Sequence, residues 1–183
     1  MAEGLTDPGD PLDSTLIQRW KEGDERAATA LVERHAGALA RYVSSMGERD
    51  AAEEVVQDTF VRAFSSLDTF RGESSLRTWL FTIARRLVVD RRRAMRRRRE
   101  VGTLDDVDAA TEYTALDGLI ANEARKKVWG AVGKLSPTQR EVFLLRVNEG
   151  LSYKEIAEVA GTTEGAARVH YHNALRTVKE NLE

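Results

Sequence analysis

The stretch 151-LSYKEIAEVAGTTEGAARVHYHNAL-175 contains two short helical patterns on either side of a glycine. Ser152 and Glu155 have the spacing of a capping box, which begins the first helix, and Gly161 ends that helix. Small residues allow the second helix to cross the first at close range: Ala157, Gly161 and Ala167. The stretch therefore predicts a helix-turn-helix. Its apolar anchors to a core are Ile156, Val159 and Leu175.

In a helix-turn-helix that reads duplex DNA, the start of the second helix enters the major groove. Thr162 or Thr163 caps that helix here, and the pattern continues to about Leu182. The side chains predicted to face base edges are Thr163, Glu164, Arg168 and His172. A guanidinium suits guanine, which makes Arg168 the candidate for that base. The side chains predicted to hold phosphate are Ser152, Tyr153 and Lys154.

Two other readings of this stretch were weighed. A well-capped helical hairpin with no DNA-binding role would show many of the same signals. His170 and His172 are close in sequence, but two residues apart on a helix they lie on different faces, and no third ligand is near. The sequence therefore predicts no metal site.

A second unusual feature is the basic run 84-ARRLVVDRRRAMRRRR-99. It holds nine arginines from Arg85 to Arg99, although the formal net charge of the whole chain is only -2. A helix C-terminus needs one or two cations, so nine of them predict a surface along which phosphates lie. The loop 68-DTFRGESS-75 precedes the helix that ends in this run. Its aromatic ring, glycine and hydroxyls suit an unstacked base.

The helix that carries the arginines has an apolar stripe at helical spacing: Leu76, Trp79, Leu80, Ile83 and Leu87. Arg77, Phe81 and Arg86 are expected to point away from that stripe. The solvent-facing side of this helix, with the loop before it, is therefore the predicted site for opening a duplex and holding one strand.

Length and composition limit the remaining possibilities. The chain has 183 residues, 42% of them apolar, enough for one domain or two small ones. It has no cysteine, which excludes disulfides, and no run of eighteen apolar residues, so we expect no membrane span. Residues 1–13 are acidic and lack the features of a secretion signal. We therefore expect a disordered tail on a cytoplasmic protein.

The pattern of elements predicts an all-α fold with two small helical domains joined by an acidic linker. In the first, residues 14–100, helices are expected at 14–21, after Asp24, at about 50–66 and from about Ser74. Residues 101–116 form the predicted linker, because residues 100–120 carry six acidic residues and no basic one. The second domain, residues 117–183, has a further capping box at 136–139 with proline at the first helical position.

Three segments together closely resemble the ECF (extracytoplasmic-function) sigma factors, small alternative sigma subunits of bacterial RNA polymerase. They are 51-AAEEVVQDTFVRAF-64, 70-FRGESSLRTWLFTIARRLVVDRRR-93 and residues 135–182, which include the helix-turn-helix. The resemblance implies that residues 14–100 are sigma region 2 and residues 117–183 are region 4. The implied partners are core RNA polymerase, promoter DNA and an anti-sigma factor, with no cofactor and no catalytic residue.

The resemblance also implies roles for particular residues. Region 2 would dock on the polymerase clamp helices through Asp50, Glu53, Gln57 and Asp58. It would recognise and melt the -10 element through Phe70, Ser74, Ser75, Arg77, Phe81, Arg85, Arg86, Arg91, Arg92 and Arg93. Region 4 would read the duplex -35 element through Ser152, Tyr153, Lys154, Thr163, Glu164, Arg168, His170 and His172.

The chain departs from the family pattern at three positions. Arg86 stands where the family usually has an asparagine that helps to hold a flipped base, and arginine can donate hydrogen bonds but accept none. His170 and Asn173 stand where the family often has arginines. Phosphate anchoring by the last helix is therefore expected to be weaker or sensitive to pH.

The predicted linker is long enough for two separate binding sites. Some twenty extended residues reach at most about 70 Å, which is about twenty base pairs of duplex. The two domains can therefore occupy promoter elements nearly two helical turns apart.

Two other classes of function were considered. A stand-alone helix-turn-helix regulator would bind an operator without polymerase, usually as a dimer on a palindrome. An enzyme would have to use His35 or the carboxylates Glu53, Glu54 and Asp58, which have no base, nucleophile or phosphate-binding loop near them in sequence.

Overall fold

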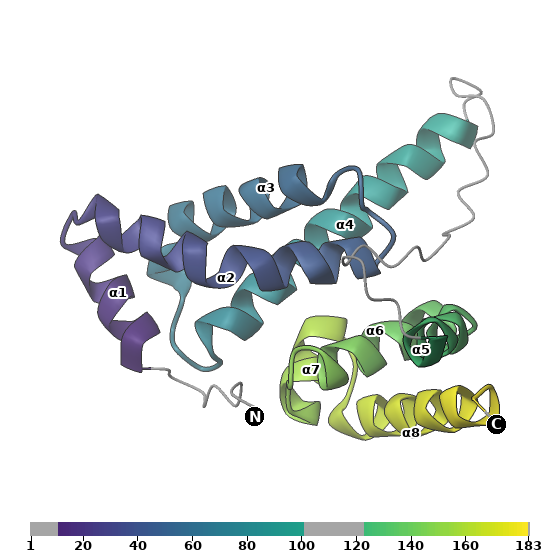
Figure 1. Cartoon of the computed structure of the whole chain (residues 1–183). Helices are drawn as coiled ribbons and strands as arrows, with labels where there is room; N and C mark the ends of the chain where they lie inside the picture. Colours follow the sequence, from purple (N-terminus) through teal and green to yellow (C-terminus); the bar gives the residue numbers. More distant parts are fainter. Residues whose placement is uncertain (1–10, 101–122, 183) are drawn as a thin grey trace.

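The computed structural model describes residues 11–100 and 123–182, and all regular elements within them are helical (Figure 1). The expected all-α fold is confirmed. The first group of helices comprises α1 (Pro11–Lys21), α2 (Glu25–Ser45), α3 (Ala52–Ser65), the short 3-10 helix η1 (Leu67–Thr69) and α4 (Leu76–Glu100). The second group comprises α5 (Glu123–Gly133), α6 (Pro137–Val147), α7 (Tyr153–Ala160) and α8 (Glu164–Glu180). The predicted linker, residues 101–116, lies outside the described residues, as do residues 1–10 of the predicted tail.

Helices α2, α3 and α4 pack together in the first group, and α4 extends beyond the other two at its arginine-rich end (Figure 1). The residues that α2 and α4 bury most deeply include Val43, Leu80, Ala84 and Val88. Phe81 is also buried, with 1% of its surface exposed, and its ring meets the Tyr42 ring edge-on. The prediction that Phe81 points away from the core is wrong. The buried side of α4 is wider than the stripe read from the sequence.

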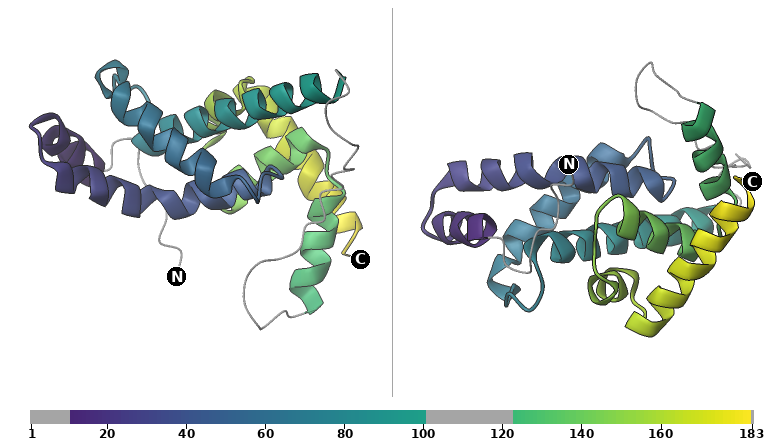
Figure 2. Two further views of the ribbon diagram at one scale, coloured as in Figure 1. Left: turned by 90° about the horizontal axis from the view of Figure 1, so that it is seen from above. Right: turned by 60° about the horizontal axis from the view of Figure 1, so that its bottom comes forward.

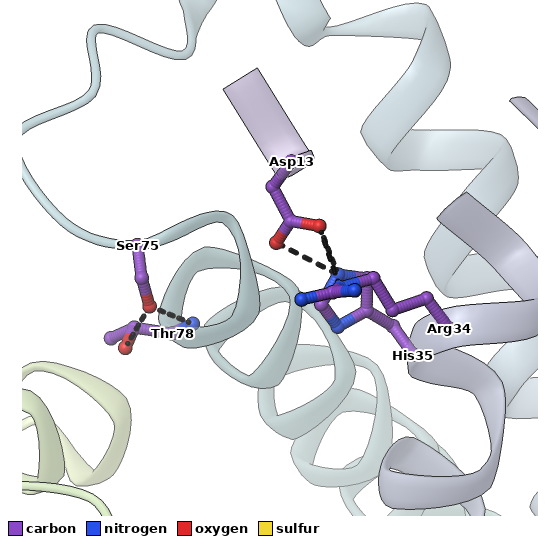
Figure 3. Close-up of polar contacts among 5 residues, drawn as sticks. All are labelled: Asp13, Arg34, His35, Ser75 and Thr78. Carbon is purple, nitrogen blue, oxygen red and sulfur yellow. Dashed lines mark hydrogen bonds and ion pairs between the residues drawn. The ribbon is translucent and has the colours of Figure 1, made fainter. Parts of the chain in front are cut away.

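Helix α1 begins earlier than the sequence predicts. Pro11 to Asp13 were expected to belong to the tail, but they form the start of α1. The Asp13 carboxylate is buried and lies 2.9 Å from Nε2 of His35 and 3.0 Å from Nε of Arg34 (Figure 3). These contacts fix α1 against α2. They also give His35 a structural role in place of the catalytic one considered above.

The helix ends of the second group follow the predicted capping chemistry. Both capping boxes are present, one between Ser136 and Gln139 and one between Ser152 and Glu155. Gly161 has φ of 63°, a left-handed conformation that side chains other than glycine rarely adopt. The Thr163 hydroxyl accepts a hydrogen bond from the backbone N–H of Ala166 and caps α8. Because these signals are local, the sequence alone predicts the helix-turn-helix.

The two groups of helices lie against each other, with α7 packed on α4 and α6 on α2 (Figure 2). One continuous cluster of buried apolar side chains spans both groups. From the second group it includes Val142, Leu145, Leu151, Ile156 and Val159, and from the first it includes Tyr42, Leu80 and Phe81. The sequence did not predict this contact, because it joins residues more than fifty positions apart.

Candidate nucleic-acid interface

The first half of α8 presents an exposed polar face. Thr163, Glu164, Arg168 and His172 are all exposed, as predicted, while Ala167, Ala174 and Val178 turn inward. The Arg168 guanidinium lies 3.0 Å from the Glu164 carboxylate. The helix-turn-helix therefore brings a donor and an acceptor together where a second helix would meet base edges.

Tyr153, one of the residues predicted to hold phosphate, has its ring against two arginines. Its ring is half-buried between two guanidinium groups, with the Cζ atoms of Arg146 and Arg168 at 4.9 and 4.8 Å from the ring centroid. Arg146 is held in turn by a hydrogen bond of 2.7 Å to the Leu151 carbonyl. Cation–π contacts of this kind restrict the arginine. The structure thus places the ring of the half-buried Tyr153 against Arg168.

Of the other two residues predicted to hold phosphate, one side chain is open to solvent and the other is engaged in a capping box. Lys154 is exposed. The Ser152 hydroxyl accepts from the Glu155 backbone N–H at 3.2 Å and donates to the Glu155 carboxylate at 2.7 Å, so the capping box occupies it. His170 is only half exposed, whereas His172 is exposed, which agrees with their expected positions on different faces.

The sequence missed Val169, which is 58% exposed beside Arg168. Gly165 lies one turn earlier on the same face, and a side chain there would meet no atom within 4 Å. A β-branched residue slightly disfavours a helix, and Val169 is not among the residues of the apolar clusters. A valine next to Arg168, on the helix predicted to read bases, was the signal that could have identified it.

The arginine-rich end of α4 is partly neutralised within the chain. Arg91 lies 2.9 Å from Glu54 and 3.6 Å from Glu48, and Arg92 lies 3.3 Å from Glu48. Arg86, Arg93, Arg96 and Arg97 are exposed. Arg93 also lies 4.0 Å from Asp90 on the same helix. The basic surface predicted from the sequence is therefore present, but three of its named arginines at this end of α4 are ion-paired.

The start of α4 and the loop before it are more buried than the sequence suggests. Phe70 is half-buried with its ring 5.1 Å from that of Trp79. Ser75 is buried, and its hydroxyl lies 2.9 Å from the Thr78 hydroxyl and accepts from the Thr78 backbone N–H (Figure 3). Ser75 therefore caps α4. Its predicted availability to DNA is wrong in this conformation, as is that of Phe81 described above.

Four glutamates of the second group contact polar side chains of α2, α4 and the loop before α4. Arg77 donates to the Glu149 carboxylate, and to the Glu149 carbonyl at 2.8 Å. Arg85 donates to Glu141 at 2.7 Å. Two weaker contacts are hydrogen bonds from neutral hydroxyls. Thr78 donates to the Glu155 carboxylate and Ser74 donates to the Glu158 carboxylate, each at 2.9 Å. We call Glu141, Glu149, Glu155 and Glu158 the acidic clasp.

Tyr42 and Arg85 share the Glu141 carboxylate. Burial raises the pKa of Tyr42 well above its usual range, and the nearby Glu141 charge raises it further. The Tyr42 hydroxyl therefore stays protonated and donates to Glu141 at 2.7 Å. Burial by itself would lower the pKa of Arg85, but the hydrogen bond to Glu141 and the charge interactions with Glu141 and Tyr42 together outweigh it, and the pKa is raised. Glu141 accordingly accepts hydrogen bonds from two donors of the first group.

The outer face of α3 is acidic and open. Glu53, Glu54, Gln57 and Asp58 are exposed, as is Asp50 just before the helix. Val61, on the same helix, is 62% exposed. The opposite side of α3 is buried in the core through Val55, Val56, Thr59, Phe60 and Ala63. The predicted docking residues thus form one continuous surface.

Within residues 11–100 and 123–182, no group of three His, Cys, Asp or Glu side chains is arranged to hold a metal ion. Among the same residues, no helix has the length and apolar character needed to cross a membrane.

Comparison with known protein families gives two matches, in the order expected. Residues 31–99 match the family model of Sigma-70 region 2, and residues 125–178 match that of Sigma-70 region 4. The first match contains α3 and α4, and the second contains the helix-turn-helix.

Individual proteins resemble the chain over nearly its whole length. The ECF RNA polymerase sigma-E factor of Haemophilus influenzae is 32% identical, over 100% of this chain and 98% of the relative. The sigma factor RpoE of Bartonella quintana, solved in complex with the anti-sigma factor NepR, has a TM-score of 0.65 and 28% identity over 84% of this chain and 95% of that one. CnrH, solved with the cytosolic domain of CnrY, has the same score and identity over 96% and 97%.

Proposed function

Because this chain belongs to the ECF sigma factors of the sigma-70 family, we propose that three of its surfaces divide the binding tasks of such a factor. The chain is an alternative sigma factor that directs RNA polymerase to promoters. The observation that carries the division of tasks is the exposed face of α8, where Glu164 and Arg168 stand beside each other at the start of a helix. The remaining surfaces lie on α3 and α4.

The α8 face reads the -35 element as duplex DNA. Arg168 donates to a guanine, and Glu164 accepts from an exocyclic amine of a neighbouring base. Lys154 contacts phosphate and sets the register of the helix in the groove. Tyr153 orients Arg168 from beneath, as its ring contact with the guanidinium supports.

The exposed side of α4 with residues 68–75 recognises and melts the -10 element. Arg86, Arg93 and the arginines that follow hold the phosphates of the separated strand. Arg86 replaces an asparagine that is usual in the family, so its guanidinium stacks on or donates to the flipped base. Ser74, Arg77 and Arg85 join this surface once their partners in the acidic clasp have left.

The acidic face of α3 docks on core RNA polymerase. Its exposed carboxylates, with Gln57 among them, suit a basic helical surface on the polymerase. Val61 supplies an apolar centre for that contact. The factor acts in the cytoplasm by binding alone, without chemistry of its own, and an anti-sigma factor controls it, as the solved complexes of its relatives support.

Run-off transcription with purified core polymerase on a random promoter library tests this function. We expect transcripts only when the factor is added, and a two-part motif among the selected promoters. A shift assay with and without core polymerase accompanies it. Specific duplex binding by the factor alone, with no transcription gained from core enzyme, would contradict the proposal.

A further inference from the structure

The second half of α8 bears a hollow that opens to solvent. Its volume is about 290 Å³, and its lining residues are His172, Leu175, Arg176, Lys179 and Glu180. Leu175 packs on the apolar cluster of the second group, and the other four are exposed. In Figure 1 this half of α8 lies along the lower edge of the second group, on the side away from α2 and α4. The hollow is therefore accessible in the arrangement that the structure shows.

The place of the hollow along α8 corresponds to the edge of a major groove. The helix has 17 residues, so it is about 25 Å long, and His172 lies about 12 Å along its axis from Glu164. The major groove of B-DNA is about 12 Å wide and about 8.5 Å deep. A helix that presents Glu164 and Arg168 to base edges therefore leaves the groove near His172. We expect this side chain, predicted from the sequence to face a base edge, to reach the backbone phosphates instead.

Arg176 lies one helical turn beyond His172 and shares its face of the helix. The hydrogen bond that the structure gives its guanidinium is a long one, 3.4 Å to the side-chain oxygen of Asn173. This neutral partner leaves the charge of Arg176 available. Lys179 and Glu180, at the far end of the hollow, carry opposite charges. Arg176 thus provides one positive charge for an anion at the near end, and protonation of His172 provides a second.

We propose that His172 and Arg176 together bind a phosphate of the DNA backbone next to the -35 element, and that the contact tightens when His172 is protonated. This inference rests on the proposed function of α8 and adds to it a site and a dependence on pH. A phosphate oxygen accepts charge-assisted hydrogen bonds from both a guanidinium and an imidazolium. The pair supplies anchoring on a helix that has His170 and Asn173 where the family often has arginines.

The neighbouring helices place aromatic rings near His172. The Tyr171 ring lies edge-on to the imidazole at 6.0 Å, and Phe143 of α6 and Tyr153 of α7 contact the Tyr171 ring in turn. From α5, Lys134 donates to the C-cap residue of α8, beyond the hollow. Among the side chains that the structure describes, no charged group of α5, α6 or α7 lines the hollow.

The charged groups that face His172 accordingly belong to α8 itself. Arg168 and Arg176 lie one turn to either side of it, and Lys179 and Glu180 lie at the far end of the hollow. A bound phosphate favours the protonated form of an imidazole, because opposite charges attract. Protonation and DNA binding are thus coupled. The affinity should rise as the pH falls past about 6.5, where an imidazole ordinarily titrates.

The test measures the affinity of the polymerase holoenzyme for a duplex carrying the -35 element, at pH 6 and pH 8 and constant ionic strength. Between pH 8 and pH 6 the wild type should gain about fivefold more affinity than the His172→Asn variant. His172→Arg carries a permanent charge, so it should respond to pH as little as His172→Asn does and bind more tightly at both values. The response should persist in His170→Asn, because that imidazole lies on a different face of α8.

Two further measurements identify the ligand as a backbone phosphate. For the wild type, the slope of log affinity against log salt should be larger in magnitude by about 0.9 at pH 6 than at pH 8, which corresponds to one more phosphate contact on duplex DNA. For His172→Asn the slope should be the same at both values. Replacing single phosphates of the duplex by uncharged methylphosphonates should abolish the pH response at one or two positions. A scan in which the response survives at every position would overturn the backbone contact.

An identical response of the wild type and His172→Asn to pH would also overturn the inference. His172 is exposed, so its replacement should leave the fold intact. The Arg168→Ala variant separates this inference from the proposed function. If Arg168→Ala leaves the base preference at the -35 element unchanged, the function proposed for α8 is contradicted. If it alters that preference while the pH responses stay identical, the phosphate site alone is contradicted.

Discussion

At the residue scale, the contact that we propose to support base recognition is the one between Arg168 and the Tyr153 ring. The guanidinium has a salt bridge on one side and an aromatic face beneath it. A side chain held in this way loses less conformational freedom when it binds a base than a mobile one. We therefore expect Tyr153 to act through Arg168.

Replacing Tyr153 tests this role. Tyr153→Ala should reduce discrimination at the guanine position read by Arg168 by about 1 kcal/mol, because the cation–π support is lost. Tyr153→Phe keeps the ring and should retain the preference. Competition among duplexes that differ at one base pair of the -35 element, bound by the polymerase holoenzyme, provides the measurement. Equal loss in both variants would show that the hydroxyl, and not the ring, matters.

Val169 gives a second residue-scale prediction. Its exposed isopropyl group beside the open surface at Gly165 suits the C5-methyl group of a thymine. Replacing that thymine by deoxyuridine removes only the methyl group and should weaken wild-type binding about threefold. The Val169→Ala variant should be insensitive to the replacement. A deoxyuridine scan of the -35 element with no effect at any position would refute the contact.

At the element scale, α4 has two kinds of arginine. Arg91 and Arg92 are paired with Glu48 and Glu54, which lie outside α4. Arg93, Arg96 and Arg97 are exposed further along the helix, and Arg93 has a contact of 4.0 Å with the exposed Asp90 one turn earlier. The affinity for DNA depends on salt only through those cations of the protein that release counterions from the phosphates. The exposed set is thus expected to dominate the phosphate contacts.

The salt dependence of single-strand binding distinguishes the two sets. Each phosphate contact contributes roughly 0.7 to the slope of log affinity against log salt for a single strand. The triple variant Arg93→Ala/Arg96→Ala/Arg97→Ala removes three such contacts and should therefore lower the magnitude of the slope by about 2. Arg91→Ala/Arg92→Ala should lower it by less, because ion pairs within the chain already use those charges. A larger effect from the second pair would mean that the pairs with Glu48 and Glu54 do not persist in solution.

The turn of the helix-turn-helix offers a matched pair of glycines. Gly161→Ala places a side chain at a φ of 63° and should cost about 1 kcal/mol of unfolding free energy. Gly165→Ala lies within α8 in open space and should stabilise by up to about 1 kcal/mol. Urea unfolding of the two variants gives both values. Equal changes of the same sign would contradict the assigned conformations.

These elements also show what the sequence could predict. Capping at Ser136, Ser152 and Thr163 and the turn at Gly161 depend on neighbours within a few residues, so the sequence predicted them. The burial of Phe81 and Ser75 was missed because α4 is covered on more sides than one amphipathic stripe implies. The start of α1 was missed because its signal is the pairing of Asp13 with His35, which is 22 positions away.

At the scale of the whole molecule, the packing of the two groups of helices against each other could not be predicted from the sequence. In the sequence, Glu141 looks like an ordinary residue of a solvated helix and Glu149 like one of a solvated turn. Only the packing of α6 on α2 and of α7 on α4 shows their partners. The predicted linker suggested two separate sites. The structure adds a closed form in which one site lies against the other.

The most direct test of this account is the distance between the two groups as polymerase binds. The chain has no cysteine, so Glu33→Cys and Lys179→Cys on exposed parts of α2 and α8 accept a donor and an acceptor dye without competing sites. The pair Gln18→Cys/Glu33→Cys, within the first group, serves as the control. We predict that core polymerase and promoter DNA sharply lower energy transfer in the first pair and leave the control unchanged. Unchanged transfer in the first pair, in a complex that transcribes, would contradict the account.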